Sequence, residues 1–293
     1  MRRWRSIAGA TAFEILSEPL SLLVTVAAQV LATLAPAFHY HQFGEATRMA
    51  RDSGFSALLV GVLAVSVFGT VRSFRREIES GTAQMALAHP VSRAGFFLAK
   101  TCGAACACLV VASILFATAV VMVNGAAIGG DVAAATGSLA KVWGPSLAIG
   151  VGSFLVPLAV AALLNRFARF RFVLTFFVLA FVCSVAGMAY RPDVRLVARM
   201  VPVALTIVLP AAVFLALTAA AAVRFGAHAT VSAAGLLFAC ALPFLGNYCL
   251  SDALSKGGTL PWAYVGLAAL AVLPAAVAFL LVGVYLFNGK DVG

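Results

Sequence analysis

The chain has 293 residues, of which 63% are hydrophobic and only 10% carry a charge. Soluble domains carry a charge on nearer a quarter of their residues, so this composition excludes an ordinary soluble fold. The net charge of +10 does not indicate nucleic-acid binding, because the basic residues lie at the ends of apolar runs and form no basic tract with interleaved aromatic residues.

Long apolar runs recur along the chain, and each is long enough to cross a hydrocarbon core of about 30 Å as a helix. Because the bilayer offers no hydrogen-bond partners to the backbone, these runs must be helical. We therefore predict an all-α, polytopic membrane protein with eight transmembrane helices. The predicted spans are residues 20–38, 55–71, 101–123, 143–164, 172–190, 204–223, 231–250 and 262–287.

The residues before the first span are basic and include Trp4 between Arg3 and Arg5. This pattern predicts that residues 1–18 form a cytoplasmic interfacial helix. With eight spans, thirteen Lys and Arg residues lie on the side of the termini and seven on the other. This bias predicts that both termini, including a tail of residues 288–293, are cytoplasmic, with the transmembrane domain covering residues 19–287.

A polar stretch, residues 71–100, separates the second and third predicted spans. If it begins as a helix, Val71, Phe74 and Ile78 fall on one apolar stripe. Arg75 can then reach Glu79 one turn later. The stretch therefore predicts an amphipathic helix at the membrane surface.

The same stretch contains signals for helix ends. Gly81 can take the left-handed conformation that ends a helix, and Pro90 limits a second short helix to about residues 82–88. Ser92 is a suitable N-cap for the helix that continues into the third span. Two short helices that meet at a glycine would present a surface that another protein can bind.

This region resembles the permease subunits of ABC-2 type transporters. The resemblance rests on a Glu-Ser-Gly-Thr string, a Pro-Val-Ser-Arg string and a lysine that opens a membrane helix, and residues 250–254 and 260–261 agree more loosely. The matching residues are Glu79, Ser80, Gly81, Thr82, Pro90, Val91, Ser92, Arg93 and Lys100. In that family, this segment is the cytoplasmic coupling element that docks on the ATPase.

The resemblance implies a coupling segment at residues 72–97, with coupling residues Arg75, Arg76, Glu77, Glu79, Ser80, Gly81, Thr82, Pro90, Ser92 and Arg93. We expect Glu77 and Glu79 to be exposed to water and to contact the ATPase, so that replacing both with Ala costs little stability. We expect Arg75 and Arg76 to hold the segment at the surface. Many ABC-2 permeases have six spans, so pore-lining positions are not carried over to this chain.

The resemblance also implies partners and a location. We expect an ABC ATPase subunit that binds ATP and Mg²⁺, a homodimer or a heterodimer with a related permease, and contacts with lipids of the bacterial inner membrane. We expect no cofactor, metal or nucleic acid to bind this chain, and no enzymatic activity of its own.

The residues themselves also favour a partner that supplies energy. The sequence has no P-loop, H-E-x-x-H or G-x-S-x-G motif. Apart from Glu14 and Glu18 near the first span, no carboxylate lies within a predicted span, which disfavours an ion-coupled transporter.

Three arginines, Arg191, Arg195 and Arg199, share one helical face of residues 191–203. They fit a helix that lies in the interface plane, and also contacts to an anionic substrate or to lipid headgroups. Two other functions therefore stay open: a membrane-embedded lipid-modifying enzyme, and a non-transporting membrane anchor that recruits cytoplasmic partners.

Overall fold

The structure, a computed structural model, describes residues 2–34, 46–79, 92–136, 139–190, 193–226, 230–231, 234–235 and 260–289. Within these residues every regular element is a helix. Six helices are long and apolar enough to cross a membrane, or seven if the bent pair α1 (Arg2–Ser17) and α2 (Pro19–Leu34) is counted as one span. The all-α, polytopic class is confirmed. The count of eight is not, because most of the predicted span 231–250 lies outside the described residues.

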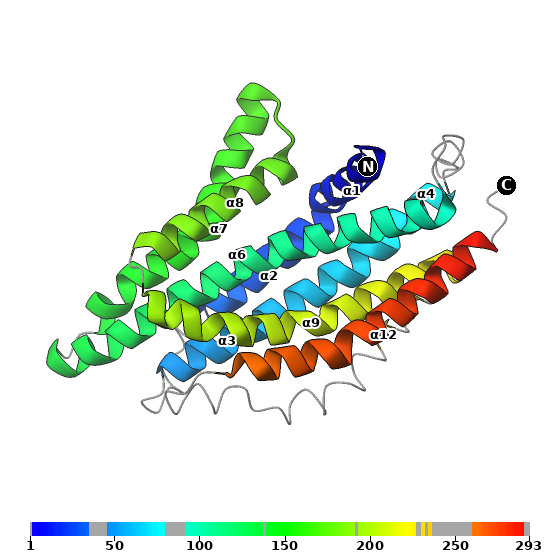
Figure 1. The fold of residues 1–293 in the computed structure, drawn as a ribbon. Coiled ribbons are helices and arrows are strands. Elements are labelled where there is room, and N and C mark those ends of the chain that lie inside the picture. The colour runs from blue at the N-terminus through cyan, green and yellow to red at the C-terminus, as the bar shows by residue number, and fades with distance from the viewer. Residues whose placement is uncertain are drawn as a thin grey trace.

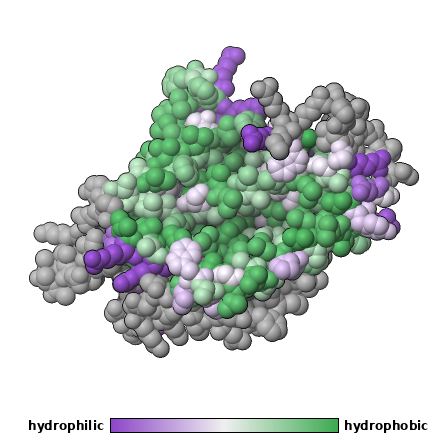
Figure 2. All heavy atoms as spheres, viewed as in Figure 1, coloured by the Kyte–Doolittle hydropathy of each residue, from purple (hydrophilic) through white to green (hydrophobic). Residues whose placement is uncertain are grey.

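The remaining elements are α3 (Ala46–Ala64), the π-helical η3 (Val65–Gly69), α4 (Thr70–Glu79), α6 (Arg93–Thr136), α7 (Leu139–Ala168), α8 (Phe172–Tyr190), α9 (Val194–Arg224) and α12 (Trp262–Asn288). Figure 1 shows α3, α6, α9 and α12 running side by side, with α7 and α8 as a hairpin against α6. On the face drawn in Figure 2, apolar side chains cover the middle and hydrophilic ones gather towards the ends.

Helix α6 is the central element of the bundle. It packs against α1, α2, α3, α7, α8, α9 and α12. In the most apolar part of α6, 72% of the residues are buried, against 6% in α12. Alanine and glycine are frequent on α6, as expected where helices approach closely in lipid. The arrangement therefore makes α6 the scaffold and α12 the peripheral helix.

Helix α1 crosses α6 at Gly103. A Cβ atom on Gly103 would meet the carbonyl oxygen of Ala8, and it would lie 2.8 Å from the Cβ of Thr11. Helices α1 and α2 then meet at an angle of 63°, where Pro19 begins α2. A proline at a first helical position needs no hydrogen bond from its nitrogen, so it suits this bend.

Three sequence-based boundaries were wrong. The second span and the helix of the polar stretch form one helix, Thr47–Glu79, because the apolar stripe continues through both. Part of the gap between the third and fourth predicted spans, residues 124–142, is helical, since α6 continues through Asn124 and Asp131 to Thr136 with no proline in its way. The separate interfacial helix expected at residues 191–203 is fused with the sixth span in α9, which is N-capped by Asp193 and continues through Pro202.

The first prediction tests the close approach of α1 and α6. Alanine favours a helix interior over glycine by about 0.5–1 kcal/mol, so Gly152→Ala on α7, where nothing lies within 4 Å of the added Cβ, should be neutral or stabilising. Gly103→Ala should instead destabilise by about 1–3 kcal/mol, because the Cβ meets backbone rather than a movable side chain. Thermal unfolding in detergent measures both, and equal stabilisation would contradict the packing.

Candidate coupling site

Helix α4 carries the amphipathic pattern expected from the sequence. Val71 and Phe74 are buried, at 3% and 2% exposure. Arg75 Nη2 donates to Glu79 Oε1 at 2.6 Å, one turn further on. Of the predicted stripe, Val71 and Phe74 are therefore buried against the bundle and Ile78 is partly buried, and the predicted Arg75–Glu79 pair is confirmed.

A lysine on α6 is bound by α4. Lys100 is fully buried, and its Nζ lies 2.6 Å from Glu77 Oε2. It also donates to the carbonyl oxygen of Ser73 at 2.9 Å. Its Nζ lies 5.2 Å from the centre of the Phe74 ring, a cation–π contact. Since a buried ammonium is costly unless it is paired, these contacts fix α4 against α6.

Helix α1 adds two carboxylates to the same face of α4. Ser73 Oγ donates to Glu14 Oε2 at 2.9 Å. Glu18 is only 12% exposed, and its oxygens lie 3.2 Å from Arg72 Nε and 3.8 Å from Arg76 Nη1. Helix α1 is therefore joined by ion pairs to the end of the helix Thr47–Glu79.

We name this group the coupling cluster. Its residues are Glu14, Glu18, Arg72, Ser73, Arg75, Arg76, Glu77, Glu79 and Lys100. It contains four carboxylates and four basic groups, so it is formally neutral. Such a set of opposed charges links helices mechanically, and the Ser73 hydroxyl in it is hydrogen-bonded to the Glu14 carboxylate. Among the described residues, no group of three or more His, Cys, Asp or Glu side chains could hold a metal ion.

Aromatic side chains lie beside the coupling cluster. The ring centres of Phe74 and Phe97 lie 5.3 Å apart, and those of Phe97 and Phe287 lie 6.2 Å apart. Arg93 Nη1 donates to the carbonyl oxygen of Asn288 at 3.1 Å. A Cβ on Gly283 would meet the Phe97 ring, so this glycine allows α12 to approach α6. The ends of α4, α6, α9 and α12 are therefore packed together.

The expectation that Glu77 is exposed to water was wrong, and with it the ground for expecting its removal to cost little stability. Its side chain is 29% exposed and pairs with the buried Lys100. Removing it would leave a buried charge without its carboxylate. Glu79 is 63% exposed and, within the described part of the chain, is paired with Arg75 of the same helix, so it remains an outward-facing group. The side chains of Arg72 and Arg76 are 59% and 68% exposed and also reach the surface.

The other predicted coupling residues divide into two groups. Ser92 Oγ accepts from the backbone N–H of Gly95 at 3.1 Å, so its N-cap role is confirmed, and Arg93 binds the end of α12. The predicted residues Ser80, Gly81, Thr82 and Pro90 lie outside the described residues.

The arginines of α9 lie far from the coupling cluster. Arg195 and Arg199 are exposed in the first turns of α9, whereas Val223 near its other end packs in the aromatic group beside Phe74. At a rise of 1.5 Å per residue, Arg199 and Val223 are separated by about 36 Å, more than the hydrocarbon core. Arg191 lies outside the described residues. The role of these arginines as substrate or lipid contacts stays a prediction.

Sequence reasoning gave no coupling role to five members of the coupling cluster. Arg72 and Ser73 lie within the predicted segment 72–97 but were not among its named coupling residues. Lys100 was seen as the lysine that opens a helix, but not as a buried partner of Glu77. Glu14 and Glu18 were noticed only as isolated carboxylates. A usable signal existed for these two, since acids near a membrane entry with no local base require a partner from another element.

A model of the family described as ABC-2 family transporter protein matches residues 16–187, which is more than half of the chain. The matched region includes α4, the start of α6 and every member of the coupling cluster except Glu14. No curated protein and no solved structure gives a significant match to the chain.

The second prediction concerns the asymmetry between two neighbouring glutamates. Glu77→Ala leaves the Lys100 ammonium buried without its carboxylate and should destabilise by about 3–5 kcal/mol. Glu79→Ala removes only an exposed helical pair and should change stability by no more than about 0.5 kcal/mol. Thermal unfolding in detergent measures both. As a control, Glu77→Gln combined with Lys100→Met should recover much of the loss, and equal effects of the two alanine variants would contradict the buried pair.

Proposed function

The chain belongs to the ABC-2 transporter family, and from this premise we propose that it is the permease subunit of an ATP-driven exporter. ATP and Mg²⁺ would bind to a separate ATPase subunit, and two permease chains, identical or related, would enclose the transport path. The observation that carries the proposal is the coupling cluster, in which the end of one long membrane helix is held to the start of another.

The geometry supports a mechanical route through the protein. The helix Thr47–Glu79 has 33 residues, about 50 Å at 1.5 Å per residue, so it extends across the hydrocarbon core and beyond. A displacement of α4 by the ATPase would pass to α6 through the Lys100–Glu77 pair, and to α1 through Glu18. The π-helical η3 interrupts the same helix, and such turns are frequent at functional sites.

The basic loop between α7 and α8 supports an orientation with this end in the cytoplasm. Arg166, Arg169 and Arg171 lie at or just after the end of α7. The Arg171 guanidinium lies 5.1 Å from the centre of the Phe13 ring on α1, which places this loop on the same side as the coupling cluster. Positive charge concentrated on one side is typical of cytoplasmic loops, so we propose a bacterial inner-membrane protein with both termini in the cytoplasm.

The two alternative functions, a lipid-modifying enzyme and a membrane anchor, require different features from those of an exporter. A lipid-modifying enzyme needs reactive side chains at one membrane depth, whereas the carboxylates of the coupling cluster are engaged with bases or with a hydroxyl. A membrane anchor would bind its partner without coupling that contact to transport. Measuring ATPase binding and transport together separates the anchor from the exporter.

The third prediction tests ATPase docking. Glu79→Arg should leave folding and membrane insertion normal, because this side chain is exposed. Charge repulsion should reduce both co-purification of the ATPase and transport-coupled ATP hydrolysis by about tenfold or more. Arg199→Glu at the other end of the bundle is the matched charge reversal and should leave co-purification of the ATPase unchanged. Full binding and transport in Glu79→Arg would remove Glu79 from the docking surface. Absence of any ATPase bound to the unsubstituted chain would remove the exporter proposal.

The fourth prediction concerns orientation. Single cysteines at Ser80 and Ala168, in a chain whose native cysteines are replaced by alanine, should react with a membrane-impermeant maleimide only after the cytoplasmic side is exposed. Arg199→Cys should react from the outer side of intact cells, because it lies about 36 Å along α9 from the coupling end. Labelling of Ser80 and Ala168 from outside would reverse the orientation and exclude the coupling role.

A further inference from the structure

A cavity of about 510 Å³ lies between α1, α3, α6, α9 and α12. Of its 17 lining residues, none carries a charge. The hydroxyl of Thr101 is bonded to the carbonyl oxygen of Phe97 at 2.9 Å, so it is satisfied within its own helix. The cavity therefore offers apolar contact to a ligand, with no charged group to recognise a polar one.

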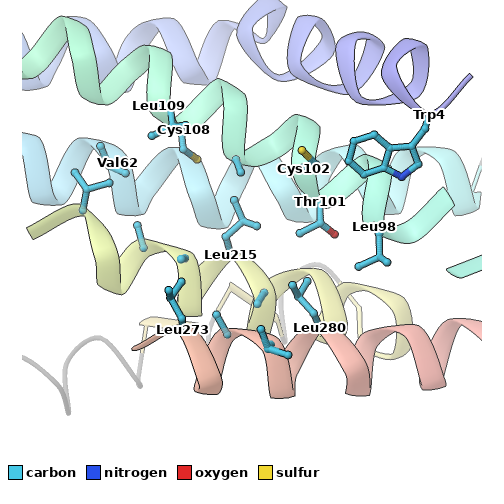
Figure 3. A pocket seen from close by; sticks show the side chains of 17 residues that line it. Trp4, Val62, Leu98, Thr101, Cys102, Cys108, Leu109, Leu215, Leu273 and Leu280 are labelled. Carbon is cyan, nitrogen blue, oxygen red and sulfur yellow. The ribbon is translucent and has the colours of Figure 1, made fainter. Parts of the chain in front are cut away.

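The floor and the rim of the cavity differ in exposure. The floor residues are buried and come from four helices: Val62, Cys108, Ala211, Leu215, Ala216 and Ala276. The rim residues are exposed: Trp4, Leu98, Leu109, Leu273 and Val277. Figure 3 shows these side chains between α6 and α12, with Trp4 at one end. The cavity thus opens sideways, onto the apolar surface that the helices turn to the bilayer.

The length of the cavity matches one leaflet. Along α6 it extends from Leu98 to Leu109, about 16 Å at 1.5 Å per residue. Half of the hydrocarbon core is about 15 Å. The Trp4 end lies beside Lys100, where the coupling cluster begins, and tryptophan is enriched at the level of the headgroups. The other end therefore lies near the middle of the bilayer.

We propose that this cavity is a binding site for one acyl chain of a phospholipid from the leaflet on the side of the coupling cluster. The chain enters from the side between α6 and α12, with its carboxyl end at Trp4 and its methyl end towards Leu109 and Leu273. The length of the cavity, its apolar lining and its sideways opening all fit a lipid acyl chain. Lipid binding to this cavity does not require the ATPase, so it can be tested independently of the exporter proposal.

Trp4 makes the site observable by fluorescence, because the chain has only two other tryptophans, Trp143 and Trp262. In the purified variant Trp143→Phe/Trp262→Phe, Trp4 is the only reporter. Titration of its detergent micelles with phosphatidylcholine that has dibrominated acyl chains should quench Trp4 saturably. Bromines near the carboxyl end should quench more than bromines near the methyl end. The variant Trp4→Phe/Trp143→Phe leaves Trp262, which is 62% exposed at the far end of α12 and should show quenching that does not saturate.

Two substitutions fill the cavity from opposite walls. Ala105→Phe on α6 and Ala212→Phe on α9 each occupy space where the chain would lie, at positions that are not fully buried. Excluding even two methylenes from burial should raise the lipid concentration at half-quenching of Trp4 about tenfold. Ala186→Phe, at an exposed position of α8 away from the cavity, is the matched control and should leave it unchanged. Two fillers on different helices keep the test decisive if one of them fails to fold.

Three results would overturn the proposal. If quenching of Trp4 does not saturate, or if neither Ala105→Phe nor Ala212→Phe changes it, the lipid contacts Trp4 only as ordinary boundary lipid. Stronger quenching by bromines near the methyl end would reject the placed direction of the chain. A filler that leaves lipid quenching intact but dissociates a permease dimer on size-exclusion chromatography would assign the cavity to a second copy of the chain.

Discussion

The buried ion pair of Lys100 and Glu77 is the constraint on which the coupling end of the molecule depends. An ammonium without contact with solvent is tolerated only if a carboxylate and further acceptors surround it. Both come from α4, as the Glu77 carboxylate and the Ser73 carbonyl oxygen, so α4 has one position relative to α6. An apolar contact between the two helices would permit sliding. A short, charged contact fixes their register, which is what a helix needs to transmit a displacement.

The first helix extends this constraint to a third element. Glu14 accepts from Ser73, and Glu18 pairs with Arg72 and Arg76 on the exposed side of α4. Ile15 packs against Gly69, where a Cβ would approach it to 2.8 Å, so α1 also rests on η3. Since α1 contacts both the π-helical turn and the charged end of α4, a movement of either would also move α1. Helices α1, α4 and α6 therefore form one unit, at the end where an ATPase would act.

Local signals in the sequence were sufficient to predict features within single helices. They did not predict contacts between helices. The Arg75–Glu79 pair, the Ser92 cap and the bounds of α8 follow from spacing within a few residues. The Lys100–Glu77 contact joins residues on different helices, and no periodicity connects them. Asn124 and the glycines after it read as a loop, yet no proline interrupts the backbone hydrogen bonding there, and α6 continues to Thr136. Helix α9 continues past Pro202 within a segment apolar enough to span a membrane, where lipid favours unbroken backbone hydrogen bonding.

The acyl-chain site and the coupling cluster both include residues of α6. A bound acyl chain would therefore affect how α6 can move relative to its neighbours. The cavity starts on α6 two residues before Lys100, so its wall moves whenever the ion pair moves α6. On the opposite wall, α12 is only 6% buried in its most apolar part; it packs against α9, and Arg93 bonds to Asn288 at its end. Close-packed side chains resist a change in the space between two helices, because each lost contact forfeits dispersion energy. An acyl chain can change its conformation or leave into the bilayer. A lipid-filled gap between α6 and α12 would therefore allow relative movement that a packed protein core would resist.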